Sequence, residues 1–201
     1  MSTFVFATDV PNVLPSTSSW ELVSNSRMFR SPLTNAIQTA ARKGSHWKIS
    51  LAFNNLSGED RANLQAFLTK LEGQEHRFSI VDHSFVRRGS GVDTGLVTAA
   101  SSGNTLNFTR SLSSSISIDK GDYISANGQL FMCTTAMAAT TATTGLSVGV
   151  SPAVRNSSVG DAVDLDTPSG VFMLTSSASW DTKPGLFSSF SIDAIEDVLA
   201  T

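Results

Sequence analysis

Short alternations of apolar and polar residues run through most of this chain, and they predict β-strands. The clearest alternation extends from His46 to Phe53, where every second residue is large and apolar and the residues between are small or polar. A period of two is that of a strand with one buried face. Shorter runs predict further strands at 3–7, 20–23, 77–81, 171–174 and 187–195, with a loop at 11–19.

One stretch has the helical period instead and predicts a helix over residues 58–72. Ser57 can cap its start, acidic residues fill its first turn, and Gly73 can end it. Its large apolar residues recur at helical spacing, namely Leu64, Phe67, Leu68 and Leu71. This stripe predicts a helix that packs through one face.

From about residue 87 the chain becomes rich in serine, threonine and glycine, without a helical period. Asn127-Gly128 separates two apolar runs there and offers the positive φ angles of a type I′ hairpin. The threonine-rich stretch 134–144 is expected to be a loop. Further short strands are predicted at 105–109, 115–118, 145–150 and 162–165. Turn signals about every 8 to 12 positions predict a small closed barrel.

The strand pattern of the first segment resumes after Pro168, so the middle of the chain is expected to be an insertion. We predict a mainly β fold with two domains. Residues 1–86 and 170–201 form the first domain, which includes the helix 58–72. Residues 87–169 form the inserted β-barrel.

Composition narrows the functions that this fold could serve. The chain has 201 residues, a net charge of −3 and only 15% charged residues, with no basic stripe, so we expect no specific nucleic-acid partner. It has no apolar run of about 18 residues, and its N-terminus carries Asp9 without a basic region. Neither membrane insertion nor a secretory signal is therefore predicted. The single cysteine, Cys133, is expected to be a small buried residue.

Residues that could carry chemistry are sparse. His76 and His83 are expected to be polar surface residues, and no nucleophile motif accompanies them. Asp161, Asp164 and Asp166 lack the glycine and closing glutamate of a calcium loop, so a solvated strand face is expected there. We predict no catalytic, cofactor or metal site, and no enzyme activity.

The segment from Trp20 to Gln74 carries a particular order of motifs. These are Trp20, Phe29-Arg-Ser-Pro-Leu33, Ala36-Ile-Gln-Thr39, Gly44-Ser-His-Trp47, the long strand, the capped helix and Leu71-Glu-Gly-Gln74. This order resembles that of the distal tail protein family of long-tailed bacteriophages. The later phrase from Gly121 to Phe131 is similar to the barrel segment of related phage proteins. The resemblance covers roughly residues 20–84 and, more loosely, 115–170.

The resemblance implies a β-sandwich with one α-helix that assembles as a hexameric ring, and an inserted OB-like β-barrel that faces outwards. The chain would then be a structural protein of the virion tail, assembled in the host cytoplasm. Its expected partners are further copies of itself, the tail tube protein above and the tail-tip hub protein below, with the tape-measure protein as a further candidate.

A homohexameric ring makes heterologous contacts, so each subunit needs two different complementary surfaces. The segment from Phe29 to Thr39 is a candidate for one of them because it is apolar without a strand or helix period. Its candidate contact residues are Pro32, Leu33 and Ile37. The alternative is a loop folded over the core of its own domain.

Two other functions stay open. A host-surface carbohydrate-recognition module is one, because small β-barrels rich in serine and threonine can bind sugars, and Trp180 with Asp181 would be the sugar contact. A tail-tube or tube-terminator subunit is the other, which would share the ring but not the inserted barrel.

Overall fold

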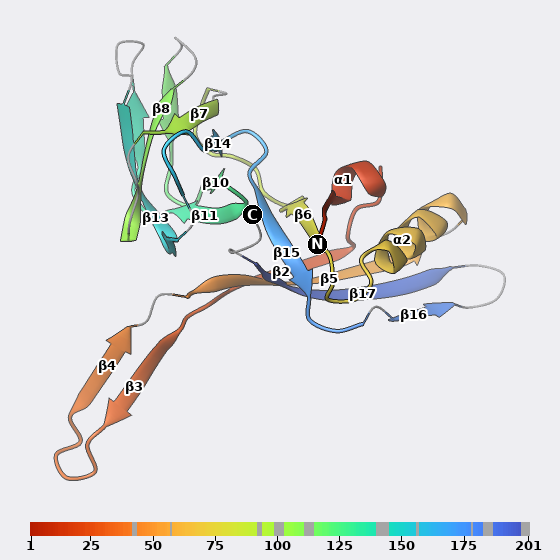
Figure 1. Ribbon diagram of the computed structural model, residues 1–201, viewed down its shortest axis with the longest axis horizontal. Helices are drawn as coiled ribbons and strands as arrows, with labels where there is room; N and C mark the ends of the chain where they lie inside the picture. The colour runs from red at the N-terminus through yellow and green to blue at the C-terminus, as the bar shows by residue number, and fades with distance from the viewer. Residues whose placement is uncertain are drawn as a thin grey trace.

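The computed structural model describes residues 1–41, 44–56, 58–91, 94–98, 103–110, 115–139, 145–155, 157–177, 179–182 and 187–197. The fold is mainly β, with 53% strand and 10% helix, and it is consistent with a β-sandwich that carries a small barrel (Figure 1). This confirms the predicted fold class.

The main sheet has seven strands in the order β1-β6-β15-β17-β5-β2, with β16 added to β17. Their bounds are β1 (Thr3–Val5), β2 (Thr17–Val23), β5 (His46–Leu56), β6 (Arg77–Val81), β15 (Ser169–Leu174), β16 (Ser179–Thr182) and β17 (Ser188–Glu196). Strands β6 and β15 are hydrogen-bonded neighbours although the whole barrel segment lies between them in sequence. The main sheet is therefore built from both ends of the chain.

Alternation along β5 and β17 builds much of the core of this sheet. Trp47, Ile49, Leu51 and Phe53 of β5 are buried, as the period of two predicted, and so are Phe190, Ile192 and Ala194 of β17. Two predictions near the N-terminus are wrong. The first strand ends at Val5, because a short helix, α1 (Phe6–Asp9), turns Phe6 into the core. Residues 17–19 are not loop, because their backbone pairs with β5.

Helix α2 (Gly58–Lys70) confirms the predicted helix and covers one face of the main sheet (Figure 1). Its stripe of Leu64, Phe67 and Leu68, continued by Leu71, is buried. The helix ends at Lys70, two residues earlier than predicted, because Glu72 and Gly73 both take positive φ angles, of 47° and 68°. Ser57, the predicted cap, lies outside the described residues.

Six strands of the inserted segment form a closed barrel in the order β10-β11-β13-β8-β7-β14. Their bounds are β7 (Thr94–Val97), β8 (Gly103–Arg110), β10 (Tyr123–Ala126), β11 (Gln129–Cys133), β13 (Gly145–Val154) and β14 (Ala162–Asp164). The Asn127-Gly128 hairpin is confirmed, with φ angles of 46° and 75° between β10 and β11. The barrel encloses its own apolar core, which includes Phe108, Phe131 and Val148.

A further pair of short strands, β9 (Ile116–Ile118) and β12 (Met137–Ala139), lies beside the barrel. Strand β12 falls within 134–144, so the prediction of a loop there is wrong for residues 137–139. Residues 137–139 form a strand because they pair with β9, since their own sequence has no alternation of apolar and polar residues. Residues 140–144 lie outside the described part of the chain.

The barrel and the main sheet share a joint. Tyr123 and Leu130 from the barrel hairpin belong to the core of the main sheet. The indole N–H of Trp47 donates a hydrogen bond to the carbonyl of Leu130 at 3.0 Å. Glu196, at the end of β17, accepts backbone N–H groups from both residues and is 5% exposed. Burial raises the pKa of Glu196 to about 7, against the opposing effect of the two N–H donors and Arg155.

Candidate functional site

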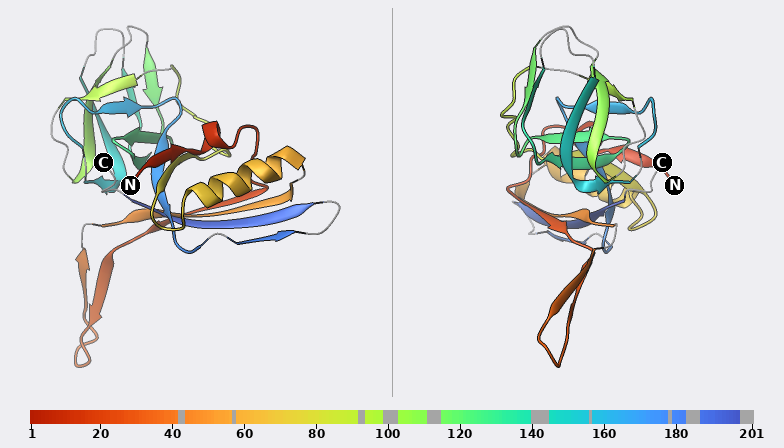
Figure 2. Two further views of the ribbon diagram at one scale, coloured as in Figure 1. Left: turned by 45° about the vertical axis from the view of Figure 1, so that its right-hand side comes forward. Right: turned by 90° about the vertical axis from the view of Figure 1, so that its left-hand side faces the viewer.

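Two strands stand apart from the sheet and barrel. Strands β3 (Ser26–Arg30) and β4 (Ile37–Ala41) form a two-stranded sheet of their own. We call this hairpin, residues 26–41, the arm. All views show it projecting from the main sheet, away from the barrel and from helix α2 (Figures 1 and 2).

The tip of the arm is a hydrogen-bonded turn. The backbone N–H of Ser31 donates to the carbonyl of Ala36 at 2.9 Å, and the N–H of Asn35 donates to the carbonyl of Ser31 at 3.0 Å. Asn35 takes a positive φ of 55°, a conformation that asparagine tolerates well. Leu33 lies in this turn and is 94% exposed. The tip is thus a built structure that presents one large apolar side chain to solvent.

Both faces of the arm carry apolar side chains. The register places Met28 opposite Thr39 and Phe29 opposite Gln38, while Ile37 pairs with Arg30 at the tip end. Met28, Phe29 and Ile37 are 66%, 57% and 60% exposed. An isolated two-stranded hairpin is marginal in water, and a cluster of exposed apolar side chains marks an interaction surface. The arm therefore exposes apolar side chains on both of its faces.

The charged side chains of the arm are all positive. Arg27 and Arg30 lie on it, and the sequence has no acidic residue between Leu22 and Trp47. Neither arginine forms an ion pair within the part of the chain that the structure describes, where the ion pairs are Lys70–Asp9 and Arg77–Asp197. An acidic surface would complement the arm.

The structure thus places all three predicted contact residues, Pro32, Leu33 and Ile37, at or beside the tip of the arm. Two expectations about their segment are wrong: it is a hairpin with strands, and it does not fold over the core of its own domain. The strand period was missed because neither face of the arm is buried, so no alternation marks it. Sequence reasoning missed Met28 and Arg27. The available signal was Asn35, a residue type that favours turns, because a turn there indicates a hairpin whose first strand includes both residues.

The predicted sugar contact lies elsewhere, on β16. The Trp180 ring is 40% exposed and its centroid is 6.1 Å from that of Phe190. It borders a shallow depression of about 240 Å³ that is also lined by Phe190 and by the small or polar residues Ala52, Asn54, Ser179, Ser189 and Ser191. Asp181 follows Trp180 on the strand, and its side chain is outside the described part of the structure.

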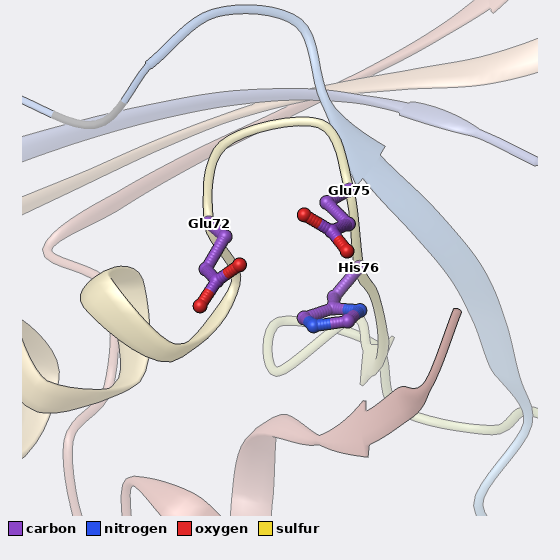
Figure 3. A group of neighbouring side chains, drawn as sticks. All are labelled: Glu72, Glu75 and His76. Carbon is purple, nitrogen blue, oxygen red and sulfur yellow. The ribbon is translucent and has the colours of Figure 1, made fainter.

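One group of side chains could approach a metal ion. Glu72, Glu75 and His76 follow helix α2, and their ligand atoms lie within 4.8 Å of one another (Figure 3). The His76 Nδ1 accepts the backbone N–H of Ser2 at 3.3 Å, which places the proton of the neutral ring on Nε2. Two exposed glutamates and a histidine with that tautomer form a weak ligand set, so we assign no metal to this group.

The three aspartates named from the sequence make local turns. Asp164 Oδ1 accepts the N–H groups of Asp166 and Thr167, and Asp161 Oδ2 accepts that of Ser158. Cys133 lies in the barrel core as predicted and is 2% exposed, and burial raises the pKa of its thiol to about 12. The absence of catalytic, cofactor and metal sites stays a prediction.

No protein-family model and no curated protein matches this chain. Neither helix in the described ranges has the length and apolar character needed to cross a membrane.

Proposed function

We propose that this chain is a structural protein of a bacteriophage tail that forms a ring, of six copies by resemblance, between the tail tube and the tail-tip hub. The observation that carries the proposal is the arm, with apolar and basic side chains exposed along a hairpin that the described residues of the chain leave uncovered. The order of motifs from Trp20 to Gln74 supports the tail assignment. The tube protein, hub protein and tape-measure protein remain the proposed partners, and the virion the proposed location.

The position of the arm suits a ring, because a ring subunit needs two different contact surfaces and the arm lies apart from the surface formed by the helices and the barrel. It extends from one side of the main sheet, and the helices and barrel lie on the other. A contact between an arm and the body of a neighbouring copy is heterologous, and heterologous contacts close into rings when the rotation permits. The closed barrel inserted between β6 and β15 favours this reading over a tail-tube or tube-terminator subunit.

The test is the mass of the purified chain by light scattering after gel filtration, with negative-stain electron microscopy of the peak. Six copies of the 21.3 kDa chain give a particle of about 128 kDa with closed cyclic symmetry. A chain that stays monomeric at all concentrations would argue against a ring component.

A second candidate function rests on Trp180. A half-exposed aromatic ring beside serine hydroxyl groups and the Asn54 amide is a surface on which a sugar ring could stack and form hydrogen bonds. A glycan array tests this carbohydrate-recognition function, with Trp180→Ala as the control. Binding that this variant abolishes would favour the receptor-binding function, whereas a ring component alone should bind no glycan.

A further inference from the structure

A groove lies around His83, where the N-terminal segment, β6 and the link between β14 and β15 meet. Two depressions of about 340 and 350 Å³ adjoin there and share Phe6, Ala7 and His83. A third, of about 200 Å³, continues past His83 to Phe85. The other apolar residues that line the first two are Val5, Val10, Val13, Leu14, Ile80 and Val81. We call this surface the His83 groove.

The rim of the His83 groove is acidic. Asp82, Asp164 and Asp166 line it, and none of its described lining residues is lysine or arginine. Asp82 and Asp164 are held by local hydrogen bonds, from Ser84 and from Thr167. Neither takes part in an ion pair of the described chain. Among the described residues, no cationic side chain is therefore paired with the carboxylates of this rim.

The imidazole of His83 does little to offset that charge. Burial lowers its pKa, although the nearby Asp82 carboxylate acts in the opposite direction. The ring also packs near Phe6, with 6.3 Å between the ring centroids. At neutral pH His83 contributes mainly a flat, uncharged surface to the groove.

The groove and the arm complement each other in both apolarity and charge. The arm presents Leu33 and Ile37 beside Arg27 and Arg30, and the groove presents an apolar floor inside an acidic rim. The groove is lined by α1 and by strands β1 and β6, at one edge of the main sheet, whereas β2 and β5, from which the arm extends, lie at its other edge. The views show α1 and β6 well apart from the arm (Figures 1 and 2), so the arm does not reach the groove of its own chain. Only another copy of the chain can bring the two surfaces together.

We propose that the tip of the arm of one copy binds in the His83 groove of the next copy, with Leu33 and Ile37 on the apolar floor and the arginines at the aspartate rim. This inference rests on the proposed ring, for which it supplies the second contact surface. The contact is heterologous and repeats around the ring, so each copy uses its arm once and its groove once.

Cysteine cross-linking tests the contact directly. The variant Val5→Cys places a thiol in the groove, Leu33→Cys places one at the tip, and the native Cys133 is buried. Phe187→Cys is the matched control, because Phe187 is 47% exposed and Val5 is 50% exposed. Mixing the Leu33→Cys chain with the Val5→Cys chain under mild oxidation should give a disulfide-linked pair, and mixing it with the Phe187→Cys chain should not.

The outcomes separate this inference from the proposed function. A particle of ring mass without the Leu33–Val5 cross-link would overturn the groove contact and leave the ring standing. Monomers without a cross-link would overturn both. An equal yield of cross-linked pairs from the Phe187→Cys and Val5→Cys mixtures would also overturn the inference. It would show that random collision, and not binding in the groove, brings the thiols together.

Charge reversal gives an independent readout that does not depend on thiols. Arg30→Glu should weaken assembly on the order of tenfold, and Asp166→Arg in the same chain should restore much of the loss, as expected for a close charge pair across an interface. Asp166 is exposed, so its substitution should leave the fold intact. Equal loss from both single variants without rescue in the double variant would contradict the placement of the arginines at this rim.

Discussion

The carboxylate of Glu196 accepts a 2.7 Å hydrogen bond from the backbone N–H of Leu130 and so ties the last strand of the main sheet to the barrel hairpin. Its other oxygen accepts the N–H of Trp47 at 3.1 Å. One buried side chain thus joins three strands, β5, β11 and β17. The indole N–H of Trp47, which donates to the Leu130 carbonyl, and the backbone N–H of Val171, which donates to the Gly128 carbonyl, join the same hairpin to the sheet.

Glu196 should make stability depend on pH. Its pKa is about 7 in the folded chain against an ordinary value of 4.5, so the folded chain binds this proton more tightly than the unfolded chain. The stabilisation is fully present below pH ~4.5 and is lost as the pH rises through ~7. At about 1.4 kcal/mol for each tenfold change in the proton equilibrium, the loss is about 3 kcal/mol.

Chemical denaturation of the wild type and of Glu196→Gln across this pH range measures the effect. The glutamine does not titrate, so the difference in free energy of unfolding between the two chains should change by up to about 3 kcal/mol. Glu21→Gln, which alters an exposed carboxylate on β2, is the control. A wild-type curve parallel to that of Glu196→Gln would show that this group does not titrate in the range.

Two aspartates at the tip of the arm should abolish assembly without unfolding the chain. Leu33 and Ile37 are 94% and 60% exposed, so replacing both by aspartate removes little buried area. The melting temperature should stay within a few degrees of that of the wild type, while light scattering shows loss of the ring. Val159→Asp, at a 66% exposed barrel position, is the matched control. Retention of the ring mass by the arm variant would remove the arm from the interface.

Gly128 should tolerate no side chain. Its φ is +75°, and a Cβ there would lie 2.9 Å from Val171 Cγ2, on the strand where the barrel hairpin meets the sheet. Gly128→Ala should cost about 1–3 kcal/mol in free energy of unfolding, measured by urea denaturation. Gly121→Ala isolates backbone strain, because Gly121 has a φ of +93° and open space around it. An equal cost at both positions would mean that the Val171 contact adds nothing.

Cys133 should react with thiol reagents only when the barrel opens. The side chain is 2% exposed and the pKa of its thiol is about 12, so thiolate is scarce at neutral pH. We expect labelling by an aromatic disulfide reagent to be slow in buffer and complete in denaturant. Fast labelling of the native chain would show that the barrel core is accessible.

Local patterns in the sequence were enough to predict the elements whose environment is simple. The alternation of β5 and the stripe of α2 record which face is buried, because burial of one face imposes the period of the element. Asn127-Gly128 predicted its hairpin because positive φ angles are a local demand on residue type. These signals also gave the mainly β class and the barrel.

Other features depend on partners distant in sequence. Nothing near Glu196 signals that its carboxylate meets the N–H groups of Trp47 and Leu130, or that Thr17 to Ser19 pair with β5. The His83 groove is likewise assembled from the N-terminal segment, β6 and the β14–β15 link.

By itself, then, the sequence determined the strands with one buried face, the helix, the hairpin turn and the lack of a basic stripe, because each follows from neighbouring residues. The tertiary structure alone decided that residues 26–41 stand out as an arm, that Asp82, Asp164 and Asp166 gather at one rim, and that Glu196 joins sheet to barrel. Those relationships are set by which strands pair and where the chain returns, and no local period encodes them.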